Sequence, residues 1–571
     1  MQERPTRLIV LVALLLAAAL MQLGSVGTTQ AATQRRAPQN IFMPAVMQRP
    51  PVSQDLTITH LGLYQTVQTA ANSVSLVAHK PALLRVYAQA QGAATPPVAE
   101  VTVYAYQDTT FLGSLTIGPQ AVPAQPSTAE LSSTFNFDLP HDWLVGNVTL
   151  TASIDPVNTV LEVNESNNDR TAQFLFHDVA PLDLTIVPIH YHDTRTGRLF
   201  EEPAHDPISD WLLGAFPVSR INVTYHSPCY VAGDLRQPNE LGRLLSALYT
   251  LASAEDGLDS TTVYYGLLPT AHTSGATWFE GGVSGLGWVG QQRVSVGLDL
   301  GVDTGHSAGH EIGHNFGRRH APCGNPSSPD PHYPYPNATI GVYGMDTEDD
   351  VLLAPTANFD MMSYCGPEWV SDYTYEGLLQ DQLARSALAD EPDEGLLLQA
   401  TLDGEEAVAM PVYRLSSAPL PQADSGYTAQ LLDESGAVVA TYPATLFEAE
   451  ETGVLAQMLV AHVPVTETPI AEVRFLRQGE VVAKRQVATG GPDAGAQQVK
   501  VTAIAAGVKL SWGRPDVPAL VRYSPDGERW TTLALDVLGG HLTLTDEQIP
   551  TAGQLQVIPG DGGPAMTVQV K

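Results

Sequence analysis

Hydrophobic and polar residues alternate along the first third of the chain. From Leu56 to Phe176, short runs with an apolar residue at every second position are separated by Pro, Gly and Asn. Alternation with a period of two is typical of strands with one buried face, and runs about ten residues apart favour a β-sandwich. We therefore expect an all-β sandwich over residues 54–180.

The pattern changes over residues 181–395, where strands and helices are mixed. Four apolar runs predict strands, at Leu184–His190, Arg220–His226, Thr261–Leu268 and Arg293–Leu300. Between them, apolar residues at spacings of three and four predict helices at Ile208–Ala215 and Leu241–Ala254. We expect this part to be an α+β domain with a mixed sheet.

After residue 396 the chain again alternates between apolar and polar positions, with frequent turns. A stretch rich in Gly, Pro and Ala at 489–496 divides this part. We expect two further β-sandwiches, over 396–490 and 497–571. The predicted fold class is therefore multidomain, with an α+β domain flanked by all-β sandwiches.

The amino-terminal segment predicts export. Arg4 and Arg7 precede the apolar run Leu8–Met21, which covers about 21 Å of helix, short of the roughly 30 Å core of a bilayer. Such a run, followed by small residues, is typical of a secretory signal, so we predict a signal peptide over 1–31, a linker over 32–53 and a secreted protein. An uncleaved anchor is the alternative, and cleavage near Ala31, near Ala32 or after Gly27 is left open.

Charge and cysteine content exclude several classes of function. The chain has 571 residues, with 28 Lys and Arg against 61 Asp and Glu, for a formal net charge of -33. Phosphate backbones and anionic lipid surfaces would repel such a polyanion, so we expect no nucleic acid partner and no membrane partner after signal removal. Three cysteines exclude a multi-cysteine metal cluster.

The stretch Gly305–Cys323 (GHSAGHEIGHNFGRRHAPC) carries the candidate chemistry. His310 and His314 are four residues apart, so on a helix both rings leave one face, with Cβ atoms about 6 Å apart. That spacing suits two nitrogens bound to one zinc ion, while Glu311 lies about 100° round the helix, within reach of a metal-bound water.

A third histidine completes this pattern. Gly317 permits a sharp turn after the helix, which would return His320 to the metal as a third ligand. Three His ligands with an open fourth position are typical of a catalytic zinc site. A non-catalytic metal site or a degenerate helix is the alternative.

These residues follow the pattern HExxHxxGxxH and resemble the signature of the metzincin zinc endopeptidases. The resemblance extends to a Met-turn at Asp360–Tyr364 (DMMSY), where it implies that Met362 lies beneath the metal. Tyr364 is similar to the tyrosine that astacins and serralysins place near zinc, as a ligand or as a stabiliser of an oxyanion. An aromatic residue of the core is the alternative for Tyr364.

A third likeness lies upstream of the motif. Ser284–Gly290 (SGLGWVG) resembles the edge strand on which reprolysin-like metzincins bind substrate, and this implies that Leu286, Trp288 and Val289 line the substrate. A Gly-rich hairpin is the alternative. The residue after the third ligand is Ala321, which leaves the subfamily open.

The flanking sandwiches also carry resemblances. Ile154–Phe176 (IDPVNTVLEVNESNNDRTAQFLF) resembles the closing hairpin of bacterial cell-adhesion-related Ig-like domains, which implies that residues 54–180 are Ig-like. Leu510–Trp512 and Val521–Gly527 resemble segments of a fibronectin III-like domain, which implies this fold for residues 497–571.

Taken with export, the metzincin resemblance implies a secreted zinc metalloendopeptidase. One Zn²⁺ would activate a water molecule, with Glu311 as the general base in the hydrolysis of peptide bonds. The implied partners are extracellular proteins or peptides, glycoproteins among them, acted on by a monomer. The alternative is an adhesion protein that binds glycans or proteins and whose metzincin domain is inactive or secondary.

Two minor expectations follow from residues near the motif. Cys323 comes soon after His320 and Cys365 adjoins Tyr364, so a Cys323–Cys365 disulfide is plausible in an exported protein and would leave Cys229 free. Pairings through Cys229 stay open. The acidic run at 346–350 (DTEDD) could hold Ca²⁺, with a solvated loop as the alternative.

Overall fold

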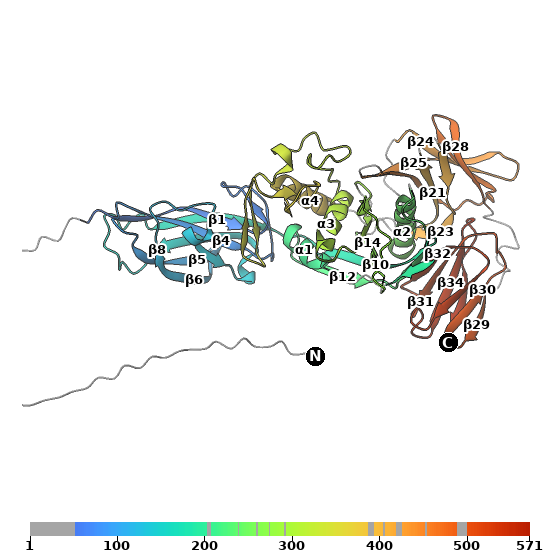
Figure 1. Cartoon of the computed structure of the whole chain (residues 1–571), viewed down its shortest axis with the longest axis horizontal. Coiled ribbons are helices and arrows are strands. Elements are labelled where there is room, and N and C mark those ends of the chain that lie inside the picture. The colour runs from blue at the N-terminus through green and yellow to red at the C-terminus, as the bar shows by residue number, and fades with distance from the viewer. Residues whose placement is uncertain are drawn as a thin grey trace, which may run out of the picture. The chain divides into compact units, whose positions relative to one another are not determined.

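The chain consists mainly of β-strands (Figure 1). The computed structural model describes residues 52–570, apart from 202–206, 238, 258–260, 273, 291–292, 386–392, 404–405, 418–424, 452–453 and 488–498. This part holds 35 strands and four α-helices, and Val52–Lys571 forms one compact unit. The predicted signal peptide lies outside the described residues.

The fold class predicted from the sequence, an α+β metzincin protease domain between sandwiches, is wrong for a chain that is nearly all β. The predicted helices do form, as α1 (Ile208–Ala215) and α2 (Glu240–Asp256), but they are joined only by α3 (Thr304–Asn315) and α4 (Asp372–Arg385). The physical reason is composition, since 48 Gly and 43 Pro interrupt helices and favour strands joined by turns.

The first part of the chain forms two sheets that pack face to face. One sheet has the order β1-β4-β7 and the other has the order β3-β9-β8-β5-β6. The strands are β1 (Asp55–Tyr64), β3 (Leu76–Val77), β4 (Leu83–Gln91), β5 (Val98–Gln107), β6 (Thr110–Ala121), β7 (Phe135–Asp138), β8 (Gly146–Ile154) and β9 (Asp169–His177). Their inward-facing residues, among them Leu84, Val101 and Leu150, form one buried core.

This sandwich is joined to the following part by a small sheet and a buried lysine. Strand β2 (Val67–Gln68) pairs with β17 (Tyr343–Asp346), which pairs in turn with β18 (Val351–Leu353). Lys80 is 1% exposed, and its Nζ donates hydrogen bonds to the carbonyl oxygens of Leu213 and Gly214 at the end of α1. The ammonium group thereby satisfies carbonyls that the helix leaves without partners.

The central sheet has the order β11-β10-β14-β16-β15, and β12 and β13 also pair with β10. The strands are β10 (Leu182–Asp193), β11 (Arg198–Phe200), β12 (Ile221–Tyr225), β13 (Cys229–Gly233), β14 (Val263–Leu268), β15 (Gly285–Gly287) and β16 (Val294–Leu298). Strands β10, β14 and β16 are parallel, whereas β15 runs antiparallel to β16. Strand β15 is therefore the edge of this sheet.

Helices cover both faces of the central sheet. Tyr264 and Leu268 of β14 pack in the core that contains α2. The alternate residues Tyr265 and Leu267 pack in the core that contains α1, α3 and α4. Because successive side chains of a strand point to opposite faces, α2 and α3 lie on opposite sides of the sheet.

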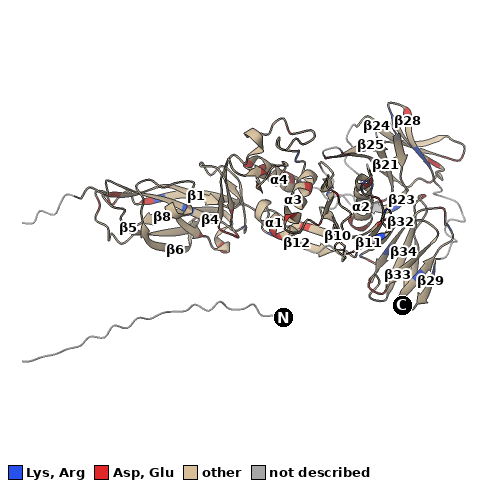
Figure 2. Cartoon of the chain, in the orientation of Figure 1, with Lys and Arg blue, Asp and Glu red and all other residues tan. Residues whose placement is uncertain are grey.

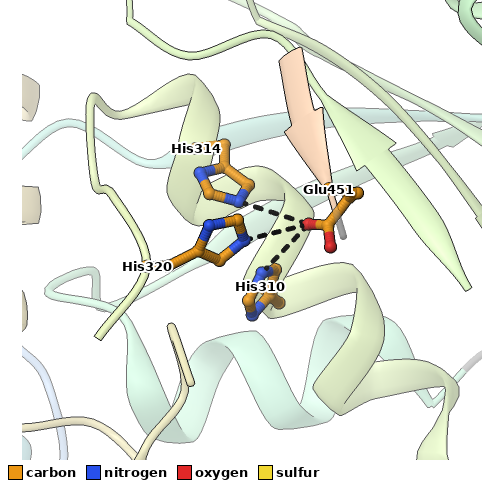
Figure 3. A group of neighbouring side chains, drawn as sticks. All are labelled: His310, His314, His320 and Glu451. Atoms are coloured by element: carbon orange, nitrogen blue, oxygen red, sulfur yellow. Dashed lines mark hydrogen bonds and ion pairs between the residues drawn. The ribbon is translucent and has the colours of Figure 1, made fainter. Parts of the chain in front are cut away.

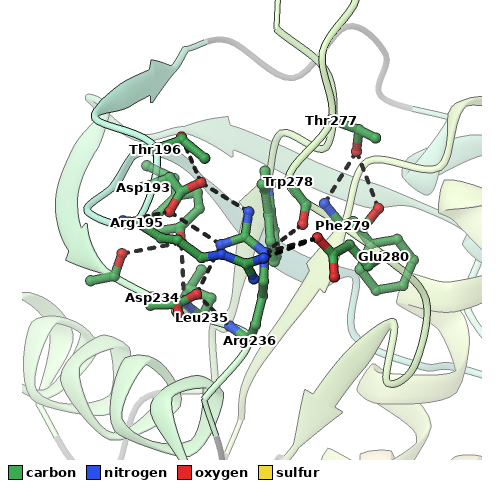
Figure 4. A network of polar contacts seen from close by, with 12 residues as sticks. Asp193, Arg195, Thr196, Asp234, Leu235, Arg236, Thr277, Trp278, Phe279 and Glu280 are labelled. Carbon is green, nitrogen blue, oxygen red and sulfur yellow. Dashed lines mark hydrogen bonds and ion pairs between the residues drawn. The ribbon is translucent and has the colours of Figure 1, made fainter.

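A buried polar network holds the loops at the β11 side of this sheet (Figure 4). The guanidinium group of Arg236 contacts both carboxylate oxygens of Asp193, one oxygen of Asp234 and the carbonyl oxygen of Trp278. Hydrogen bonds from Arg236 hold the pKa of the Asp193 carboxyl well below its usual range. This network contains no unpaired donor for a ligand among the described atoms, so we read it as structural.

Two further groups of strands follow. One sheet has the order β22-β21-β26-β25-β24-β27-β28, with β23 paired to β21, and its strands are β21 (Asp393–Asp403), β22 (Glu406–Ala409), β23 (Tyr413–Ser417), β24 (Tyr427–Leu432), β25 (Val438–Glu451), β26 (Val454–Pro464), β27 (Glu472–Arg477) and β28 (Glu480–Gln486). The last part has two sheets, β29-β30-β33 and β32-β31-β34-β35, built from β29 (Lys500–Ile504), β30 (Gly507–Ser511), β31 (Ala519–Ser524), β32 (Thr531–Val537), β33 (His541–Thr545), β34 (Gly553–Pro559) and β35 (Met566–Val570).

These sheets share a core with the central part of the chain. Phe447 and Met458 of the β25–β26 hairpin and Leu520 of β31 belong to the same buried cluster as α2. At Gly242 of α2, a Cβ atom would lie 2.7 Å from the Cβ of Ala456, so the helix and β26 pack in direct contact. The parts of the chain are therefore packed on one another through a continuous apolar core.

Charged residues and helix lengths agree with the sequence. Figure 2 shows Asp and Glu distributed over the described sheets and helices, with fewer Lys and Arg between them. None of the helices in the described part of the chain combines the length and the apolar composition that a bilayer-spanning segment needs.

The segment between α3 and α4 contains little regular structure and is closed by a disulfide. Cys323 and Cys365 are bonded, with Cα atoms 5.8 Å apart, and Cys229 is free and buried. The two short strands of this segment that pair with each other are β19 (Phe359–Asp360) and β20 (Glu368–Trp369). The disulfide restricts a loop of 42 residues that the helices alone do not hold.

Replacing both Cys323 and Cys365 by Ala should lower the free energy of unfolding by about 2–4 kcal/mol, because the unfolded chain gains conformational freedom. Denaturant unfolding measures this loss. A reducing agent should produce a similar loss in the wild-type chain and none in the double variant. Equal sensitivity of the two proteins to reduction would contradict the prediction.

Replacing Lys80 by Met should remove a pH dependence of folding. Burial lowers the pKa of Lys80 to about 7, whereas lysine in an unfolded chain titrates near about 10.4. Between these values the unfolded chain binds the extra proton, so wild-type stability should rise with pH by up to about 1.4 kcal/mol per pH unit. Urea unfolding between pH 7 and 10 should show this rise in the wild type and not in Lys80→Met.

Candidate metal centre

Helix α3 carries two of the candidate ligands on one face. His310 and His314 are 8% and 2% exposed, and the Nδ1 atom of each lies 2.7 Å from a backbone carbonyl oxygen, of Met361 and of Arg318 respectively. A carbonyl oxygen only accepts, so each Nδ1 carries the proton and donates it. The Nε2 atom of each ring is therefore left with its lone pair.

Glycines let α3 reach this position. A Cβ atom at Gly309 would lie 1.9 Å from the ring of Trp211 in α1, and one at Gly313 would lie 2.5 Å from the Sδ of Met362. On the side of β15, a Cβ atom at Gly287 would lie 2.3 Å from the carbonyl oxygen of Glu311. Only glycine allows these approaches, and they fix the helix between α1, β15 and the loop of Met362.

The chain turns sharply after α3 and brings in a third histidine. Gly317 has a φ of +72°, and Arg318 N donates to the carbonyl oxygen of Gly313 at 3.1 Å, which ends the helix. His320 then lies beside the other two rings, and its Nδ1 donates to Ser327 O at 2.9 Å. All three histidines predicted as ligands are thus brought together.

Glu451 faces the three histidines from β25 (Figure 3). Its Oε1 atom lies 3.1 Å from the Nε2 of His320, 3.4 Å from that of His310 and 3.6 Å from that of His314. These four ligand atoms lie within 4.8 Å of one another, and all four residues are buried. The fourth position, which the sequence pattern suggested was open, is taken by a carboxylate.

The sequence alone did not point to Glu451. It follows His320 by 131 residues, in an acidic run of a strand that alternates in the usual way. The one weak signal is a pair of adjacent Glu residues at the end of an otherwise apolar β25, where a surface location is the ordinary expectation.

The donor set fits a divalent cation. The Nε2 atoms of His310 and His314 are buried without a hydrogen-bond donor, and the carboxylate is also an acceptor. Acceptors facing one another repel unless a cation or a proton lies between them. The edges of a tetrahedron with bonds of 2.0–2.1 Å are about 3.3–3.4 Å long, which matches the observed separations. The chain therefore contains a His and Glu cluster that can bind a metal.

The charges in the centre are strongly coupled. Burial is the largest influence on His314 and lowers its pKa to about 4. Burial opposes protonation of His310 too, but Glu451 and Glu311 raise its pKa to about 9. Burial and the charge of Glu451 raise the pKa of Glu311 well above its usual value. In the absence of a cation, the cluster thus retains a proton that a metal would displace.

The other residues of the motif also lie at the centre. Glu311 is 3% exposed and lies against Gly285 of β15, and its Oε2 has no hydrogen-bond partner. Met362 lies beneath α3, and the hydroxyl of Tyr364 contacts Glu451 and lies 3.1 Å from the Nε2 of His320. These positions agree with the sequence pattern, whereas the catalytic roles given to Glu311 and Tyr364 stay predictions.

The predicted substrate strand is covered by the chain itself. Leu286 and Trp288 are buried, and the backbone N–H of Val289 donates to the carbonyl oxygen of Glu448 in β25 at 2.8 Å. The rings of Trp288 and Phe447 lie 6.2 Å apart. A segment of β25 therefore occupies the edge at which an added strand was expected.

A cleft of about 830 Å³ adjoins the centre. Glu451 and Glu311 lie at its inner wall, and Asp303, His306 and Glu368 contribute to the rest of its lining. His306 and Glu368 form an ion pair of 3.2 Å. The cleft is polar and acidic, as expected for a site that binds hydrogen-bonding groups.

The acidic run at 346–350 does not form a second centre in the described residues, where His310, His314, His320 and Glu451 are the one such group. Asp346 accepts hydrogen bonds from the backbone N–H groups of Glu348 and Asp349, which closes the turn between β17 and β18. This geometry agrees with the solvated loop rather than with a Ca²⁺ site.

Comparison with known proteins identifies one segment of the chain. The CARDB family model matches residues 53–172, the sandwich formed by β1 to β9. This segment includes most of the stretch that resembles cell-adhesion-related Ig-like domains. No curated protein matches the chain.

Solved structures show only distant similarity. A CARDB domain from Pyrococcus furiosus, determined in complex with di-metal ions, is 21% identical over 22% of this chain and 97% of that domain, with a TM-score of 0.17. A domain of a putative cell surface protein from Methanosarcina acetivorans is 25% identical over 22% of this chain and 94% of its own, with a TM-score of 0.15. A β-glycosidase from Bacteroides vulgatus is 10% identical over 90% of this chain and 79% of its own, with a TM-score of 0.14. TM-scores this low support no conclusion about function.

These comparisons correct the interpretation drawn from the motif. The metzincin resemblance does not identify the chain, because the family match is to CARDB and the similar structures are not proteases. The predicted secreted zinc metalloendopeptidase, a hydrolase, is therefore wrong. The physical reason for the error is that HExxHxxGxxH specifies three metal ligands and leaves the fourth undetermined. The family that the comparisons support is CARDB, for residues 53–172 alone.

Proposed function

We propose that this chain is an extracellular or cell-surface binding protein of several β modules, stabilised by one zinc ion in a closed centre. The observation that carries the proposal is the fourth ligand, Glu451, whose carboxylate meets His310, His314 and His320. Zinc sites with four protein ligands are structural, whereas catalytic sites keep a position for water.

The donor set favours zinc. Three imidazole nitrogens and one carboxylate oxygen in a compact tetrahedral arrangement suit Zn²⁺, whereas Ca²⁺ takes six to eight oxygen ligands. The backbone carbonyls that accept from each Nδ1 orient the rings and increase their basicity. A zinc ion would tie α3 to β25, two elements far apart in the sequence.

A binding role is supported by the modules around the centre. The CARDB match at residues 53–172 and the resemblance of this sandwich to cell-adhesion-related domains favour adhesion. The net charge of -33 disfavours nucleic acid and anionic membranes as ligands. We propose that the ligands are proteins or glycoproteins outside the cell, reached by export through the amino-terminal signal and bound by a monomer.

The purified chain should contain one zinc ion, and His314→Ala should weaken zinc binding by more than about 100-fold. Loss of the hydrogen-bond partner of a ligand costs about 10–100-fold, and loss of the ligand itself costs more. Metal analysis after dialysis against a graded zinc buffer measures the affinity. The matched control is His332→Ala, because the side chain of His332 is 84% exposed and lies outside the centre. Wild-type affinity in His314→Ala would refute the site.

Zinc should stabilise the folded chain. A ligand that binds only the folded state adds about 2.7 kcal/mol at a free concentration of 100 times its Kd. Thermal unfolding of the wild type should shift to lower temperature after treatment with a chelator and return when zinc is added. His314→Ala should show no such response. A wild-type unfolding temperature independent of zinc would exclude a structural role for the ion.

A further inference from the structure

The tip of the β25–β26 hairpin has an anchored base and a polar end. At the base, Phe447 and Ala449 are 5% and 0% exposed and belong to the core that contains α2. At the end, the Glu451 carboxylate contacts the three histidines and the hydroxyl of Tyr364. The base therefore keeps its place through apolar packing, whereas the end is held by polar contacts.

The same segment covers the free edge of the central sheet. The carbonyl oxygen of Glu448 accepts a hydrogen bond from Val289 N–H at 2.8 Å, just beyond β15. Strand β15 pairs with β16 on its other side. Residues 448–451 thus make two contacts with the site, one to a backbone N–H beside an edge strand and one to the metal ligands.

These two contacts depend on a cation to different degrees. The hydrogen bond between Val289 and Glu448 needs no metal. The contact of Glu451 with His310 and His314 joins acceptors, and the protein supplies no described donor to their Nε2 atoms. The cation that satisfies the histidines therefore also retains Glu451.

We propose that the hairpin end, defined as residues 448–451, is a metal-dependent latch: zinc holds Glu451 over the centre, and loss of zinc frees the hairpin end and uncovers the edge beside β15. The latch rests on the zinc centre of the proposed function and adds a regulated state to it. With the latch closed, the inner end of the cleft is blocked by Glu451. With the latch open, the edge accepts an extended peptide segment in place of the hairpin end.

Hydrogen exchange of the full-length chain tests the latch. Peptides that contain Val289 should exchange at least about tenfold faster after zinc removal, because the N–H loses its acceptor when the hairpin end leaves. Glu451→Gln loaded with zinc should exchange as fast as the zinc-free wild type. Unchanged protection of Val289 in both samples would overturn the proposal.

Glu448→Gln is the matched control. It lies in the same hairpin, but its side chain is exposed and contacts Gln457, and only its backbone carbonyl binds Val289. This variant should show wild-type exchange at Val289 and wild-type zinc affinity. Faster exchange in Glu448→Gln would mean that the hairpin responds to any substitution, which would contradict a specific role for Glu451.

A peptide added in solution gives a second, independent measurement. The probe is a fluorescent TLFEAEE peptide, which corresponds to residues 445–451. It should bind zinc-loaded Glu451→Gln at least about tenfold more tightly than the wild type, because in the wild type the attached segment competes at an effective concentration of the order of millimolar. The TLFEAEQ peptide, which lacks the terminal carboxylate side chain, should bind at least about tenfold more weakly than TLFEAEE.

Equal binding of the two peptides, or equal binding to the variant and to the wild type, would overturn the latch. The proposed function fails separately, when the wild-type chain binds no zinc. A chain that binds one zinc ion but protects Val289 equally with and without it would retain the structural centre and lose the latch.

Discussion

Four acceptor atoms face one another in the interior of this chain, and the surrounding structure is arranged around that constraint. Three imidazole Nε2 atoms and one carboxylate oxygen cannot share a buried space without a positive charge between them. Each ring is fixed in this orientation because its Nδ1 donates to a backbone carbonyl. The centre thereby couples the ends of distant segments, namely α3, the loop of His320 and β25.

Close backbone packing makes the arrangement possible. Glycines in α3 admit Trp211 and Met362, and the glycines of β15 admit Glu311. Each helical glycine costs up to about 1 kcal/mol of helix propensity, which is offset when the neighbouring elements bury apolar surface against the helix. The Cys323–Cys365 disulfide then holds the irregular segment that carries Met362 and Tyr364 beside the ligands.

The fourth ligand changes what the centre can do. Three histidines with a free position would activate water, whereas a buried carboxylate in that position excludes water and joins two parts of the chain. The continuous core between α2, the β25–β26 hairpin and β31 supports the same conclusion, because it places the hairpin against the central sheet irrespective of the metal. A module with this wiring suits a binding protein whose parts must stay in a fixed arrangement.

The sequence by itself determined the local structure and three of the ligands. Periodicity placed α1 and α2, alternation placed the strands of the first sandwich, and the spacing of His310, His314 and His320 with Gly317 specified a shared metal, because these features depend on neighbours within about ten residues. Only the tertiary structure decided the rest. Glu451 reaches the histidines, and Glu448 reaches Val289, because β25 packs against the central sheet. Contacts between segments more than a hundred residues apart leave no periodic trace in either segment. The local motif therefore specified a metal site, and the distant strand decided that the site is closed.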